Sequence, residues 1–173
     1  TTFHGRPSSL RAIVLLPKGY SDSPSRQYPT IYTVPAFRST LVQEHRRAAL
    51  LRGPVIEFNS QGVQFIRVIL DAASARGHHL FADSATNGPV GTALMRELIP
   101  YIESRFRAVP AGRARFLVGH SSGGWSALWL QVCYPTRFGG AWSVAPDPIT
   151  FDHFLGMSIY NDTSAYVDGG GRR

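Results

Sequence analysis

The sequence predicts an α/β protein in which a mostly parallel sheet is flanked by helices. Three observations lead to this prediction. Short apolar runs alternate with segments of helical periodicity, Gly and Pro residues separate the two kinds of segment, and the run at residues 64–71 is apolar almost throughout. A nearly continuous apolar strand is typical of a sheet that is covered on both faces. Strands that alternate with helices favour parallel crossover connections.

The first half of the chain supplies three expected strands and one helix. Residues 12–17 (AIVLLP) and 30–35 (TIYTVP) are short runs that each end in proline, with a polar loop between them. Residues 40–52 show helical spacing and are followed by a Gly-Pro pair, which predicts the end of the helix. Residues 64–71 (QFIRVILD) form the third expected strand.

A second helix is expected after the loop that leaves the third strand. Asn87 is a candidate N-cap, and Pro89 suits the first turn of a helix. Pro100 lies inside the helical pattern and predicts a kink or a break. One apolar face recurs at every fourth residue: Leu94, Leu98, Ile102 and Phe106.

The last expected elements are a strand at 114–119, a helix at 122–134 and a strand at 139–146. Cys133 is the only cysteine, which excludes an intrachain disulfide, and we expect it to be buried in the last helix. Residues 149–173 have no periodicity and are predicted to be irregular. The length of 173 residues predicts a single domain over 1–173.

The composition argues against two classes of partner. No stretch approaches the roughly 20 uninterrupted apolar residues of a membrane span. The net charge of +7 comes almost entirely from arginine, but the arginines are dispersed and form no basic stripe with aromatic residues. This pattern does not predict nucleic-acid binding. The chain begins at Thr1 without a basic region and apolar core, so no leader indicates a location.

The stretch RFLVGHSSGGW at residues 115–125 contains the motif G-x-S-x-G, centred on Ser121. A buried strand is expected before the motif and a helix after it, which is the context that a nucleophilic serine requires. Glycines two residues before and after the serine, Gly119 and Gly123, allow the sharp turn. The alternative is a glycine-rich loop that packs or binds an anion without catalysis.

The segment GHSSGGWSALWLQVCYPTRFGGAWSVAPD, together with ELIPYIESRFR upstream, resembles α/β-hydrolase esterases of the esterase D and enterochelin-esterase type. That family includes feruloyl esterases and bacterial mycolyltransferases, and the resemblance extends from about residue 11 to residue 148. It implies the N-terminal portion of an α/β-hydrolase fold, with Ser121 as the nucleophile. The implied oxyanion donors are the backbone N–H groups of Ser122 and of Ala36 or Phe37.

A serine nucleophile needs a histidine base and a carboxylate that orients it, and in this fold both follow the serine in chain order. The only histidine after Ser121 is His153. We therefore expect the usual acid and base to lie beyond Arg173. Asp147 could orient a histidine or merely stabilise its own loop. His153 could fold back over Ser121 or lie at the surface.

The loop RGHHLFADSATNGP leaves the third strand at the edge where open α/β sheets bind ligands. His79, Asp83 and Asn87 are therefore candidate substrate contacts, as is Asp147, and a structural loop is the alternative. The adjacent pair His78 and His79 does not predict a metal site, because neighbouring side chains on an extended segment point to opposite faces.

The leading hypothesis is a serine esterase that hydrolyses a small-molecule ester through an acyl-enzyme on Ser121, without a cofactor. One alternative is acyl transfer to an alcohol. The other is an inactive fragment or a non-catalytic binding module. The sequence leaves the substrate and the oligomeric state open, and the resemblance favours a periplasmic or secreted location.

Overall fold

Five strands form the central sheet, in the order β3-β5-β4-β6-β7. The computed structural model describes residues 2–3, 6–50, 62–75, 77–152, 157–164 and 166–167. The strands of the central sheet are β3 (Ala12–Leu15), β4 (Thr30–Val34), β5 (Ile66–Leu70), β6 (Arg115–His120) and β7 (Gly140–Val144). A separate antiparallel pair near the N-terminus joins β1 (Thr2–Phe3) to β2 (Arg6–Pro7).

The sheet is mostly parallel, as the sequence predicts. Strand β4 lies at its centre and pairs in parallel with β5 and β6, with Tyr32 opposite both Val68 and Leu117. Strand β7 extends the parallel set beside β6. Among the described strands of the central sheet, only β3 runs antiparallel to its neighbour, β5. The carboxyl ends of β4, β5, β6 and β7 therefore meet at one edge of the sheet, where open α/β sheets bind ligands.

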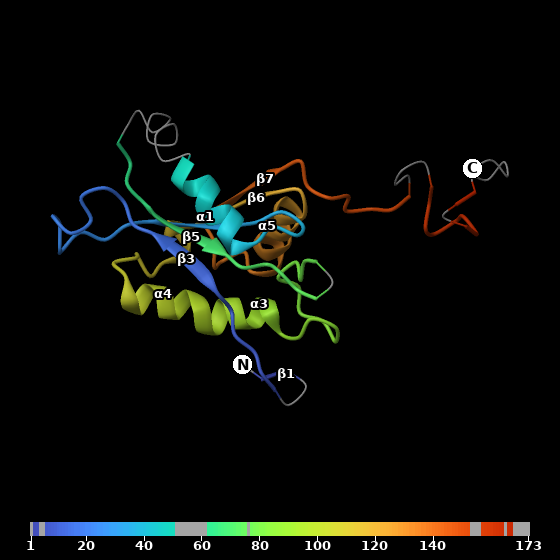
Figure 1. Cartoon of the computed structure of the whole chain (residues 1–173), viewed down its shortest axis with the longest axis horizontal. Coiled ribbons are helices and arrows are strands. Elements are labelled where there is room, and N and C mark those ends of the chain that lie inside the picture. Colours follow the sequence, from blue (N-terminus) through green and yellow to red (C-terminus); the bar gives the residue numbers. More distant parts are fainter. Residues whose placement is uncertain are drawn as a thin grey trace.

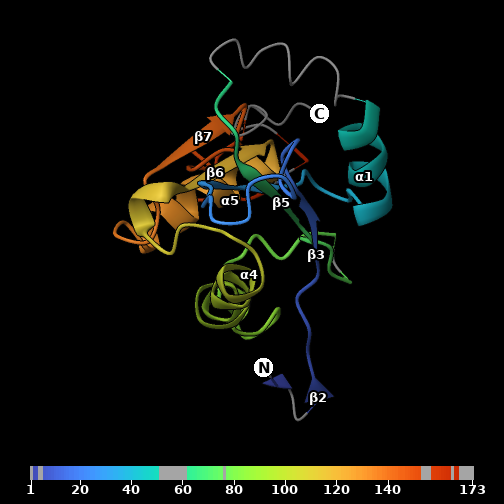
Figure 2. The same cartoon turned by 90° about the vertical axis from the view of Figure 1, so that its left-hand side faces the viewer.

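Helices lie on both faces of the sheet (Figures 1 and 2). Helices α3 (Val90–Ala93), η1 (Leu94–Leu98) and α4 (Ile99–Arg105) run as one continuous stretch along one face. The short 3-10 helix η2 (Gly112–Ala114) leads into β6. Helix α5 (Ser122–Cys133) packs on β4, β6 and β7. Helix α1 (Leu41–Leu50) lies on the opposite face, near β3 and β5.

Alternate residues of the strands build the core beneath α4 and α5. Every second residue of β4 and β5 enters it, because successive side chains of a strand point to opposite faces. The packed set includes Tyr32, Val34, Val68, Leu70 and Leu117 from the sheet and Leu94, Ile99, Ile102, Ala127 and Leu130 from the helices. The expected apolar face of the second helix is thus confirmed at Leu94 and Ile102.

Pro100 neither breaks the helix nor ends it. The residues before it form the π-helix η1, in which the N–H of Ile99 donates to the carbonyl of Leu94, five residues back. Proline lacks an N–H and its ring presses on the carbonyl four residues back, here that of Arg96. The wider π turn relieves this conflict, so the helix continues.

Two further expectations concern the segment after β7 and Cys133 in α5. Among the described residues, none after Val144 belongs to a helix or strand, and the irregular segment at 149–173 stays a prediction. Cys133 is exposed, so the expectation of a buried thiol is wrong. The reason lies in α5, whose apolar residues surround the helix and do not reveal which side faces the sheet. No helix in the described part of the chain is long and apolar enough to cross a membrane.

Candidate active site

Ser121 occupies the turn between β6 and α5. Its φ of 56° and ψ of −127° lie in a region that L-residues other than glycine rarely adopt. The N–H of Ser121 donates to the carbonyl of Val144 at 3.0 Å, and its carbonyl accepts from the N–H of Trp125 at 3.0 Å. Strand β7 and helix α5 therefore hold this strained residue from two sides. The expected strand and helix around G-x-S-x-G are both confirmed.

The glycines of the motif are required by close backbone contacts. A Cβ on Gly119 would lie 2.0 Å from the carbonyl oxygen of Gly123. A Cβ on Gly123 would lie 2.2 Å from the carbonyl oxygen of Val34 and 2.6 Å from that of Pro35. The turn at Ser121 thus packs directly against the end of β4, with no room for any side chain between them.

The hydroxyl of Ser121 donates a hydrogen bond to Asp147. Ser121 Oγ lies 3.2 Å from Asp147 Oδ1, and Ser122 Oγ lies 2.5 Å from Asp147 Oδ2. Asp147 follows β7, so the carboxylate ties the segment after that strand to the first turn of α5. A carboxylate in this position can hold the Ser121 hydroxyl in one rotamer.

Backbone N–H groups lie on two segments beside the turn, at the start of α5 and just after β4. Ser122 is the first residue of α5, where N–H groups have no partner within the helix and the helix dipole favours negative charge. Ala36 and Phe37 follow β4, and within the described part of the chain their N–H groups donate to no other group. Because Gly123 touches the carbonyls of Val34 and Pro35, these two sets of amides come from segments in direct contact.

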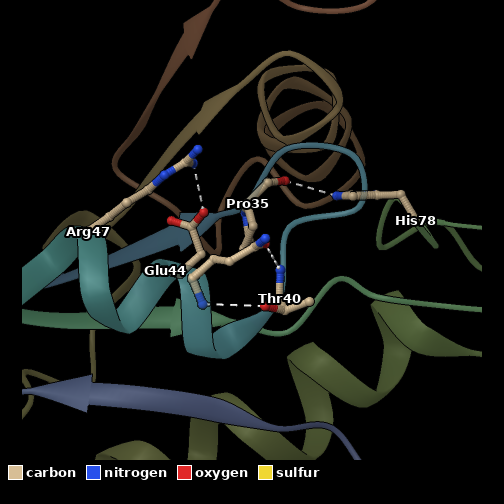
Figure 3. A network of polar contacts seen from close by, with 6 residues as sticks. Pro35, Thr40, Glu44, Arg47 and His78 are labelled. Carbon is tan, nitrogen blue, oxygen red and sulfur yellow. Dashed lines mark hydrogen bonds and ion pairs between the residues drawn. The ribbon is translucent and has the colours of Figure 1, made fainter.

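His78 approaches the site from the loop after β5. Its Nε2 lies 2.9 Å from the carbonyl oxygen of Pro35 (Figure 3), and its Nδ1 accepts from the N–H of Leu80 at 2.9 Å. Burial lowers the pKa of the His78 ring below 6.5, and the Pro35 carbonyl and the charge of Asp147 oppose this shift. The contact between His78 and Pro35 was not predicted from the sequence. The only local feature that could have indicated it is the Gly-His-His segment, which follows β5 at the edge of the sheet where ligands bind.

The structure places the three candidate substrate contacts of the same loop elsewhere. His79 is buried, with Nε2 at 3.2 Å from the Asp71 carbonyl oxygen and its ring edge-on to Phe81. Asp83 Oδ1 accepts from the N–H groups of Gly91 and Thr92 at 2.7 and 3.0 Å, at the start of α3. These bonds engage groups other than Ser121 and Asp147, so contact with a substrate stays a prediction for His79 and Asp83.

Asn87 is the third of these candidates. Its backbone N–H donates to Ser84 Oγ at 3.0 Å within a turn. The expectation that Asn87 caps the following helix is wrong, because Asp83 binds the N–H groups at the start of α3. A carboxylate four residues earlier reaches these groups because the turn at 84–88 folds back on itself. Contact with a substrate stays a prediction for Asn87 as well.

His153, the remaining candidate, lies outside the described residues. In the described part of the chain, no group of three His, Cys, Asp or Glu side chains could hold a metal ion.

Solved structures of other proteins share this architecture. A ferulic acid esterase has a TM-score of 0.70 at 20% identity, over 80% of this chain and 53% of that chain. A ferulic acid esterase from Anaeromyces mucronatus, solved in complex with ferulic acid, has a TM-score of 0.62 at 19% identity, over 87% and 63%. A fluorophosphonate-binding serine hydrolase of Staphylococcus aureus, solved with substrate bound, has a TM-score of 0.62 at 15% identity, over 81% and 58%. The fold is that of the α/β-hydrolases.

The family follows from the sequence match. Residues 6–158 match the protein family described as "Putative esterase". Because this match spans most of the chain, the protein belongs to that family. The chain spans between half and two thirds of the length of the three solved proteins above. A comparison with curated proteins gives no match.

Proposed function

We propose that the protein is a serine hydrolase of carboxylic esters that forms an acyl-enzyme on Ser121. The observation that carries this proposal is the backbone of Ser121, held at φ 56° between a buried strand and the start of a helix. Backbone strain of this kind concentrates at functional sites. A strand, a G-x-S-x-G turn and a helix in this order are the arrangement of serine hydrolases with this fold. Membership of the esterase family supports the same reaction.

In the proposed reaction, Ser121 Oγ attacks the carbonyl carbon of the ester and loses its proton to a general base. The tetrahedral intermediate collapses, the alcohol leaves with that proton, and the acyl group remains on Oγ. Water then attacks the acyl carbon, the acid is released and the Ser121 hydroxyl is restored. No redox cofactor or metal enters this sequence of steps.

The negative charge on the carbonyl oxygen needs donors that are fixed before the reaction begins. The N–H of Ser122 at the start of α5 is one proposed donor, and the N–H of Ala36 or Phe37 is the other. Their support is geometric. The turn that carries Ser122 packs directly on the end of β4, and the amides of Ala36 and Phe37 have no other acceptor in the described part of the chain.

The reaction also needs a general base that accepts the proton of the Ser121 hydroxyl. Asp147 accepts the hydrogen bond of the Ser121 hydroxyl and so can orient its proton, whereas the usual proton acceptor in this fold is a histidine. Both ring nitrogens of His78 are engaged by Pro35 and Leu80. We expect a histidine that follows Ser121 in chain order to act as the base.

The intact mass of the protein before and after reaction with a fluorophosphonate probe tests the proposal. We expect one adduct in the wild-type protein and none in Ser121→Ala. Ser122→Ala is the matched control, because it removes the neighbouring hydroxyl but keeps the proposed backbone donor, so it should still be labelled. A wild-type chain that remains unmodified would overturn the proposal for this chain and favour a binding module.

The substrate class is tested with two esters of different acyl groups. Feruloyl esters are a natural first choice because two similar structures are ferulic acid esterases, and p-nitrophenyl acetate serves as the small comparison. Acyl transfer is tested in the same assay. If an added alcohol captures the acyl group in preference to water, the protein is a transferase, and an unchanged yield of free acid assigns hydrolysis.

A further inference from the structure

The loop over residues 35–40 carries one of the two proposed oxyanion donors, and hydrogen bonds hold both of its ends. At the far end, the N–H of Thr40 donates to Gln43 Oε1 at 3.0 Å, and the N–H of Gln43 donates to Thr40 Oγ1 at 3.3 Å (Figure 3). These two bonds form a capping box at the start of α1. Within the loop, the N–H of Ser39 donates to the carbonyl of Ala36 at 3.1 Å.

At the Pro35 end of the loop, the His78 side chain makes the hydrogen bond. Proline has no N–H, so Pro35 can be held through a hydrogen bond only at its carbonyl oxygen, which lies 2.9 Å from His78 Nε2 (Figure 3). The N–H of Leu80 donates to His78 Nδ1, so that nitrogen is an acceptor and the ring proton resides on Nε2. The His78 ring is buried, with 8% of its surface exposed, and its pKa is lowered by burial. The ring is therefore neutral at neutral pH and donates to Pro35.

The direction of the Ala36 N–H depends on this bond. The Pro35 carbonyl and the Ala36 N–H belong to one trans peptide unit, in which the two groups point in opposite directions. Fixing the carbonyl therefore fixes the N–H. The Pro35 oxygen is also close to Gly123, where an added Cβ would lie 2.6 Å away. The carbonyl is thus held between the His78 ring and the turn that carries Ser121.

The loop that carries His78 also contacts Phe37, which follows Ala36 in the loop over residues 35–40 (the donor loop). A Cβ on Gly77 would lie 2.4 Å from the ring of Phe37, so the aromatic ring rests against the backbone of Gly77. The segment around His78 therefore holds both the Pro35 peptide and the Phe37 side chain.

We propose that His78 is a positioning residue, which orients the Pro35–Ala36 peptide so that the Ala36 N–H serves as the second oxyanion donor. This inference rests on the proposed function of Ser121. It assigns His78 no proton transfer and no contact with the substrate. Loss of the Nε2 donor would let the peptide rotate and weaken the transition state without changing how the ester binds.

Two substitutions separate the donor from the bulk of the ring. His78→Leu removes the donor and keeps an apolar side chain, whereas His78→Gln returns an amide N–H at a similar reach. We expect kcat for p-nitrophenyl acetate and the rate of fluorophosphonate labelling to fall at least about tenfold in His78→Leu, with KM nearly unchanged, since losing an oxyanion donor outright costs about 100 to 1000 fold. His78→Gln should recover most of this loss.

Ile102→Ala provides the control for stability. Ile102 is buried in α4, on the helix face that packs on the core, and its truncation destabilises the protein without touching the donor loop. After correction for the folded fraction, its labelling rate should equal that of the wild-type protein. An equal fall in His78→Leu and Ile102→Ala, or a His78→Gln variant as slow as His78→Leu, would overturn the inference.

A second measurement does not depend on activity. The amide ¹H and ¹⁵N resonances of Ala36 and Phe37 should shift in His78→Leu and return towards wild type in His78→Gln, while those of Gly139 and Gly140, at the start of β7 and away from the donor loop, stay in place. An unshifted Ala36 amide in His78→Leu would also overturn the inference. If the wild-type protein is not labelled at all, the proposed function has failed, and the Ala36 amide still decides whether His78 holds the peptide.

Discussion

The hydroxyl of Ser121 donates to the carboxylate of Asp147, with 3.2 Å between Oγ and Oδ1. Asp147 also accepts from Ser122 Oγ, whose residue is 5% exposed. One carboxylate thus binds the two serines on either side of the boundary between turn and helix. The position of the segment after β7 is therefore tied to the first turn of α5 through Asp147. The same carboxylate sets the orientation of the Ser121 hydroxyl.

Asp147→Ala should reduce the free energy of unfolding by about 1 to 3 kcal/mol, because it leaves the buried Ser122 hydroxyl without its partner. Urea denaturation measures the change. In a Ser122→Ala background the same substitution should cost less, since the hydroxyl that needs a partner is gone. Asp152→Ala, in an exposed part of the same segment, should stay within about 0.5 kcal/mol of wild type. An identical loss in both backgrounds would show that the Ser122 bond is not the cause.

Gly123→Ala should be strongly destabilising, by about 1 to 3 kcal/mol or more, because the new Cβ would overlap the carbonyl oxygens of Val34 and Pro35. The folded yield and the urea midpoint report the effect. Gly140→Ala is the matched control on β7, since its Cβ would meet only a Phe116 ring carbon at 3.9 Å. A Gly123→Ala variant as stable as Gly140→Ala would contradict the close packing of the turn on β4.

Much of the fold could be predicted from the sequence because each strand is a compact apolar run between Gly and Pro residues. The direction of β3 could not, since a strand carries no local sign of whether its neighbour runs parallel or antiparallel. The π turn before Pro100 is also hidden, because proline predicts a conflict but not how the helix relieves it. The exposed Cys133 was misplaced because α5 lacks a clear polar face.

The site was predictable in part for a similar reason. The serine motif is local, so the turn at Ser121 could be placed from neighbouring residues alone. The partners of the turn come from far away: Asp147 lies 26 residues along the chain from Ser121, and His78 lies 43 residues from Pro35. Such contacts are set by the order of the strands in the sheet, which single-sequence patterns do not specify.

Asp83→Ala should cost about 1 to 2 kcal/mol of stability, because the carboxylate accepts two N–H groups at the start of α3 and a third bond from the Thr92 hydroxyl. Urea denaturation measures the loss. Asn87→Ala, four residues later in the same loop, should change stability by no more than about 0.5 kcal/mol. If Asp83 only caps the helix, KM for an ester stays the same once the folded fraction is considered. A raised KM at unchanged stability would instead support the predicted substrate contact.

Acid should destabilise the protein through its two adjacent buried histidines. Burial is the main cause that lowers the pKa of both His78 and His79 below 6.5. Asp147 raises the pKa of His78 in part, while His78 further lowers that of His79, and Asp71 raises it in part. Below about pH 6.5 the unfolded chain therefore binds more protons than the folded protein, and stability falls as the pH falls.

The expected slope is at most about 1.4 kcal/mol per pH unit for each histidine, and the stability is fully present above about pH 6.5. Urea denaturation between about pH 5 and pH 7.5 measures this slope. His79→Gln should make the curve shallower, because one of the two groups no longer titrates. A stability that is constant over this range in the wild-type protein, or a slope that His79→Gln leaves unchanged, would contradict the assignment to the buried pair.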